Sequence, residues 1–162
     1  MTGILIAFDF ASMLLLGWVF VAGFYIPNAA GIAAHIRLAL IATALSVFAH
    51  SMTMMYVVAV GRMIREAVEK ASLNDKYVAQ TKSYRKVVFR YASIAMLFVM
   101  MNTILAGGAH TKMFPLWVHT ALAIVTLVLN AYSVYLEIRY LITNHLLGHH
   151  VAQEYSATQD KH

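Results

Sequence analysis

Four stretches of the chain are apolar and long enough to cross a lipid bilayer. They cover about residues 4–26, 36–61, 88–106 and 116–138. An α-helix of about 20 apolar residues spans the hydrocarbon core of a membrane. Short turns join the first stretch to the second and the third to the fourth, which makes neighbouring helices antiparallel. The pattern predicts an all-α integral membrane protein, a single domain over residues 1–162 with an antiparallel bundle of four transmembrane helices.

The second and fourth stretches each carry small and polar residues at helical spacing along one side. In the second stretch the series is Ala39, Thr43, Ser46, His50, Thr53 and Gly61. In the fourth it is His119, Ala123, Thr126, Asn130, Ser133 and Glu137. Small residues let membrane helices approach closely, and polar residues need partners away from lipid. We therefore expect the two series to face each other in the interior of the bundle.

Residues 62–87 are polar and rich in helix-forming residues, with a break at Ser72 to Asp75. Residues 62–90 hold eight basic residues, whereas the loops on the opposite side hold only Arg37 and Lys112. Cytoplasmic segments of membrane proteins carry the excess of lysine and arginine. The sequence thus predicts a helical hairpin that projects into the cytoplasm, with both termini on that side of a bacterial inner membrane. The tail, residues 139–162, is expected to be helical to about Val151 and irregular beyond.

The composition supports the membrane class and restricts the chemistry. Hydrophobic residues make up 61% of the chain and charged residues 12%, against about 25% charged in soluble domains. The net charge of +5 comes from residues beside the spans, so it indicates orientation and does not indicate a nucleic-acid partner. The absence of cysteine excludes disulfides, cysteine-ligated iron–sulfur clusters and haem attached through cysteine. Three kinds of site remain possible: haem b held by histidine or methionine, a quinone site, and a copper site.

His50 is the sharpest candidate, because an ionisable residue at mid-membrane depth is a functional-site hypothesis by default. At about 1.5 Å of rise per residue, His50 and Asn130 both lie within about 5 Å of the midplane, and Met96 shares that layer. His50 is interpreted in three ways: a packing residue bonded to Asn130, a haem or metal ligand assisted by Met96, or a partner for protons or quinone.

A second group of histidines, His35, His110 and His119, lies toward the outer face. His119 is about 14 Å from the level of His50, so the two cannot ligate one iron in a single protomer. We hypothesise that His35, His110 and His119 bind a cofactor. The candidate metal ligands are His50, His119 and His110. The M-x-x-x-M spacing of Met96 and Met100 is similar to that of copper transporters, which leaves copper as an alternative.

Asp9, Arg90 and Glu137 lie near the predicted cytoplasmic ends of the spans. Ionisable groups there pair with one another or reach toward the interface. We expect an ion-pair cluster among these residues and Arg139, with a proton entry point as the alternative.

No motif of a soluble enzyme is present, so a subunit is favoured over a stand-alone enzyme. The first interpretation is a small membrane subunit of an electron-transfer, respiratory-type assembly that binds haem b or quinone through histidines. The alternatives are a non-catalytic scaffold or assembly subunit and a copper- or proton-handling membrane protein. The expected partners are the lipid bilayer and other membrane subunits or further copies of the chain.

Overall fold

The computed structural model describes residues 1–26, 28–110, 113 and 115–159, apart from the side chains of residues 109, 110 and 159. Its elements are α1 (Thr2–Ala22), the 3-10 turn η1 (Gly23–Tyr25), α2 (Ala29–Ala71), α3 (Lys76–His110) and α4 (Leu116–Gln159). All four α-helices are long and apolar enough to cross a membrane. The predicted all-α class is therefore confirmed, with four candidate spans at the predicted places.

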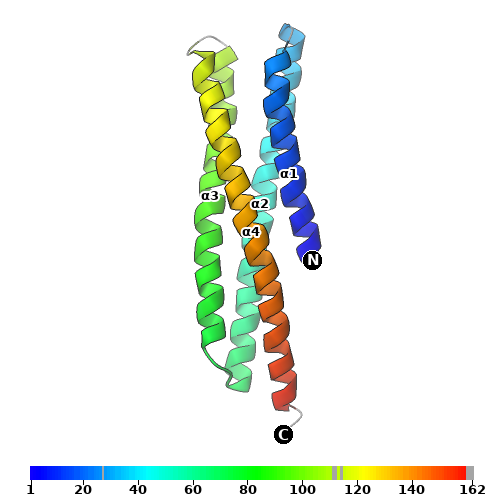
Figure 1. The fold of residues 1–162 in the computed structure, drawn as a ribbon, viewed down its shortest axis with the longest axis vertical. Helices are drawn as coiled ribbons and strands as arrows, with labels where there is room; N and C mark the ends of the chain where they lie inside the picture. The colour runs from blue at the N-terminus through cyan, green and yellow to red at the C-terminus, as the bar shows by residue number, and fades with distance from the viewer. Residues whose placement is uncertain (27, 111–112, 114, 160–162) are drawn as a thin grey trace.

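The helices lie lengthwise against one another (Figure 1). α1 and α3 end, and α2 and α4 begin, at one end of the molecule, whereas α2 ends and α3 begins at the other, so successive helices run in opposite directions. Contacts join α3 with α4, α2 with α3, and α1 with α2, and both α1 and α2 also contact α4. The interior is consequently shared by all four helices.

Three of the helices extend well beyond the start of α1. The hydroxyl groups of Thr2 and Tyr56 are 3.0 Å apart, which fixes the level at which α1 begins. Residues 57–71 of α2 continue for about 22 Å past that level, beside the neighbouring parts of α3 and α4 (Figure 1). We call this region, residues 57–86 and 145–159, the distal end.

The distal end has a core of its own, formed by Ile64, Val68, Tyr77 and Val151. The Tyr77 hydroxyl also donates a hydrogen bond of 2.8 Å to Glu154 of α4. The expectation of an irregular tail after Val151 is wrong, because α4 stays helical to Gln159. The tail remains ordered because it packs on the α2–α3 hairpin, which the local pattern of its residues does not reveal.

The break predicted at residues 72–75 is confirmed. Ser72 ends α2 in the left-handed region, with φ of 51°, and the Leu73 amide bonds to the Val68 carbonyl at 3.0 Å. The Asn74 side chain then accepts a hydrogen bond of 2.9 Å from the Lys76 amide, which starts α3. The third apolar stretch was expected to end at about residue 106, whereas α3 runs on to His110.

Each helix turns one regularly spaced face inward. On α1 the buried residues are Leu5, Asp9, Ser12 and Leu16. On α3 they are Val88, Ala92, Ala95, Val99 and others at similar spacing. The polar series of α2 and α4 meet as expected, because the Ser46 hydroxyl donates a hydrogen bond of 3.0 Å to Asn130.

Candidate functional sites

His50 lies at the centre of a buried polar cluster contributed by α2 and α4. Its Nδ1 is 2.7 Å from Oε1 of Glu137, and its Nε2 is 3.1 Å from Oδ1 of Asn130. The Ser133 hydroxyl donates a second hydrogen bond of 2.7 Å to the same Glu137 oxygen. His50, Asn130, Ser133 and Glu137 are all at most 1% exposed. Both ring nitrogens of His50 are engaged, so neither is available to ligate a haem iron or a metal without breaking a contact.

The sequence predicted the contact with Asn130 but not the one with Glu137. A helical side chain leans toward the N-terminus of its helix, so the carboxyl group of Glu137 lies beside Ser133, one turn above its own backbone. Depth counted from backbone positions therefore placed Glu137 too close to the end of the span. Glu137 bonds to His50 and Arg90 is exposed, so the ion pair with Arg90 stays a prediction.

Asn130 has a fixed orientation that determines the protonation of His50. Its Nδ2 donates a hydrogen bond of 2.9 Å to the Thr126 carbonyl, which can only accept. Its Oδ1 therefore faces Ser46 and His50 and accepts from both. His50 Nε2 must carry a hydrogen, and a second proton is shared between Nδ1 and Glu137. The pair is neutral overall, whichever atom holds that proton.

Asp9 of α1 is a third buried ionisable residue at the level of this cluster. It lies seven residues after Thr2, and His50 lies six residues before Tyr56, so both are about 10 Å above the level of the Thr2–Tyr56 contact. Asp9 is 0% exposed and interacts electrostatically with Glu137 and His50. Within the described part of the chain, neither of its carboxyl oxygens has a hydrogen-bond partner. The sequence placed Asp9 at a membrane boundary, whereas it lies at the level of His50.

Met96 lies near this layer but contacts a different residue. Its sulfur is 3.7 Å from the hydroxyl of Ser51, and its side chain is half-buried. The partners found for His50 are oxygen atoms of Asn130 and Glu137. The structure thus gives no support to Met96 and His50 as a ligand pair.

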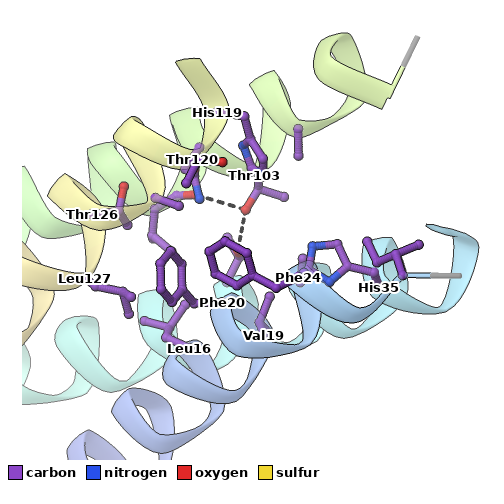
Figure 2. A pocket seen from close by; sticks show the side chains of 18 of the residues that line it. Leu16, Val19, Phe20, Phe24, His35, Thr103, His119, Thr120, Thr126 and Leu127 are labelled. Atoms are coloured by element: carbon purple, nitrogen blue, oxygen red, sulfur yellow. Dashed lines mark hydrogen bonds between the residues drawn. The ribbon is translucent and has the colours of Figure 1, made fainter. Parts of the chain in front are cut away.

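A cavity of about 430 Å³ lies nearer the other end of the bundle and contains His35 and His119. Figure 2 shows His119 and Thr103 on one wall, and Phe24 and His35 on another. The two histidines come from α2 and α4, and Phe20 from α1. Most of the lining is apolar, with polar contributions from His35, Thr43, Asn102, Thr103, His119, Thr120 and Thr126. We call it the His35–His119 cavity.

Close approaches between helices shape this cavity. A Cβ atom at Gly23 would lie 3.3 Å from Cε1 of His35, so the glycine makes room for the imidazole. The hydroxyls of Thr43 and Thr103 are 2.6 Å apart and join α2 to α3. Oδ1 of Asn102 is buried and finds no hydrogen-bond partner among the described residues. A ligand in the cavity would have a polar group of the protein ready to meet it.

The predicted outer histidine cluster is brought together in part. His35 and His119 line the same cavity, whereas the side chain of His110 lies outside the described residues. In the described ranges, no three histidine, aspartate or glutamate side chains are grouped so as to hold a metal ion. Metal binding by His50, His119 and His110 therefore stays a prediction without structural support.

No family model, curated protein or solved structure matches the chain.

Proposed function

We propose that this chain is a small membrane subunit of an electron-transfer assembly and binds a quinone-class molecule in the His35–His119 cavity. The carrying observation is the combination of apolar walls with two imidazoles from different helices. A quinone ring is flat and uncharged, and its two carbonyl oxygens at opposite edges accept hydrogen bonds. Imidazole and amide N–H groups around the cavity are donors of this kind. The volume of about 430 Å³ is typical of small-molecule pockets, which span about 300–1,000 Å³.

Quinone suits this cavity better than haem b does. Haem carries two propionate groups, whose charges require basic or strongly polar partners. None of the described residues that line the cavity is a lysine or an arginine. His50, the other candidate ligand, already uses both ring nitrogens. A neutral ligand avoids the cost of burying unpaired charge.

The same proposal includes an orientation for the antiparallel bundle. α2 has 43 residues and is about 65 Å long, roughly twice the thickness of the hydrocarbon core. The 21 residues of α1 are close to one membrane thickness, so α1 marks the level of the bilayer. The distal end is then cytoplasmic, because lysine and arginine concentrate on the cytoplasmic side. The cavity faces the opposite side of the membrane, the periplasm in a bacterial inner membrane.

Equilibrium binding of a short-chain quinone tests the proposed ligand. The wild-type protein in lipid nanodiscs is titrated with decylubiquinone by calorimetry, together with His119→Leu and His35→Leu. Each substitution should weaken binding about five- to tenfold, because one hydrogen bond contributes about 1 kcal/mol. His145→Leu is the matched control, since His145 is exposed at the distal end.

Three results would contradict the proposal. The first is an absence of saturable quinone binding to the folded wild-type protein. The second is equal affinity of the wild type, His119→Leu and His35→Leu. The third is stoichiometric haem in the gently purified protein that is lost in His119→Leu, which would assign the cavity to haem b.

A further inference from the structure

Three ionisable side chains from three helices are buried at about the same level in the interior of the spans. Asp9 comes from α1, His50 from α2 and Glu137 from α4, and each is at most 1% exposed. His50 and Glu137 are in contact, and Asp9 interacts electrostatically with both. Buried ionisable residues at such depth in a membrane protein are costly and mark proton or ion pathways. Binding of a quinone-class ligand in the His35–His119 cavity does not involve these three residues.

Among the described residues, no lysine or arginine is buried beside the cluster. α3 presents Val88, Ala92 and Ala95 to the interior, and its Arg90 is exposed. Every lysine and arginine that the structure describes is exposed. The positive charge available to the two carboxyl groups is therefore the proton on His50.

The hydrogen-bond geometry identifies the group whose protonation changes the net charge. The His50–Glu137 pair is neutral, because one proton is shared between Nδ1 and Oε1 while Nε2 donates to Asn130. With Asp9 ionised, the cluster would have a net charge of −1 among side chains that are at most 1% exposed. An uncompensated buried charge costs several kcal/mol. Protonation of Asp9 removes this charge and breaks no hydrogen bond, since both of its oxygens lack partners within the described ranges.

We propose that Asp9, His50 and Glu137 form a proton-binding site within the membrane, in which the His50–Glu137 pair shares one proton and Asp9 takes up and releases a second. The uptake forms an O–H bond on the Asp9 carboxylate, and release returns the proton to water or to a neighbouring base. Asn130 connects this site to the His35–His119 cavity, because it contacts His50 and the backbone of Thr126, a lining residue. The proton site does not depend on the identity of the cavity ligand, since all its groups belong to the protein.

Infrared spectroscopy of the protein in nanodiscs tests the proposal directly. A protonated carboxylic acid has a carbonyl stretching band that the carboxylate lacks. The wild type should show this band at neutral pH and lose it reversibly as the pH is raised. The component of this band that shifts with carboxyl-labelled aspartate should be absent in Asp9→Asn and unchanged in Asp75→Asn, the matched control, because Asp75 is exposed.

Isotope labelling keeps the test decisive even if Asp9→Asn does not assemble. The chain contains three aspartates, Asp9, Asp75 and Asp160, so wild-type protein with carboxyl-labelled aspartate should show a shifted band. Absence of the band in the wild type at neutral pH would overturn the proposal. Absence of any component that shifts with labelled aspartate, or persistence of that component in Asp9→Asn, would also overturn it. Loss of the band with sodium but not with choline would overturn it in favour of a monovalent cation site.

Discussion

At the scale of single residues, the contact between His50 and Glu137 explains how two ionisable groups are accommodated in an apolar interior. The pair is neutral, and its outer hydrogen bonds go to Asn130 and Ser133. Removal of one partner from a buried pair is costly because the other is left without compensation. The pair therefore matters for the stability of the fold mainly because loss of either residue leaves the other buried without a partner.

His50→Gln should destabilise the protein by about 3–5 kcal/mol at neutral pH, because Glu137 loses the group that shares its proton. Adding Glu137→Gln should restore much of that loss, since two amides can bond to each other without charge. Thermal unfolding in detergent measures both effects, with His145→Gln as the exposed control. Additive effects of His50→Gln and Glu137→Gln would contradict the pairing, because coupled residues are non-additive.

At the scale of elements, the sequence predicted the spans, the break at residues 72–75 and the inward faces of α2 and α4. Those features follow from periodicity, and a repeat such as Thr126, Asn130 and Ser133 identifies a face without further information. The meeting of His50 with Asn130 followed from depth. The contact with Glu137 did not, because it depends on where a long side chain extends from its backbone. The helical tail beyond Val151 was missed for a related reason, since its order comes from tertiary packing on Tyr77.

The inward face of α3 gives a prediction for helix packing. Ala95 is 0% exposed, so Ala95→Leu should force neighbouring helices apart and cost about 1–3 kcal/mol. Val128 is 62% exposed, and Val128→Leu should leave the stability unchanged. Thermal unfolding midpoints of the two variants in one detergent make the comparison. Equal midpoints would mean that α3 does not pack tightly through Ala95.

At the scale of the whole molecule, the two sites occupy different levels of one bundle. The proton cluster lies about 10 Å above the start of α1, and the His35–His119 cavity lies farther from the distal end. The distal end adds a third feature, a small core of its own outside the length of α1. We still expect the chain to associate with other membrane subunits or with further copies of itself.

Cysteine labelling tests the proposed orientation. The chain has no native cysteine, so single cysteines at Lys76 and Met113 report one end each without background. An impermeant maleimide added to intact cells should label Met113→Cys and should label Lys76→Cys only after the membrane is opened. Labelling of Lys76→Cys in intact cells would reverse the orientation.

Quinone binding in the His35–His119 cavity is tested most directly by mapping the residues to which a photoreactive quinone attaches. An azido-quinone is photolysed with the wild-type protein in nanodiscs, and the labelled peptides are identified by mass spectrometry. We expect labelling of residues that line the His35–His119 cavity, in the segments 16–26 and 116–127, and loss of that labelling when unlabelled quinone competes. Labelling confined to the exposed groove around Met55 and Met63, or labelling that competitor does not reduce, would contradict quinone binding in this cavity.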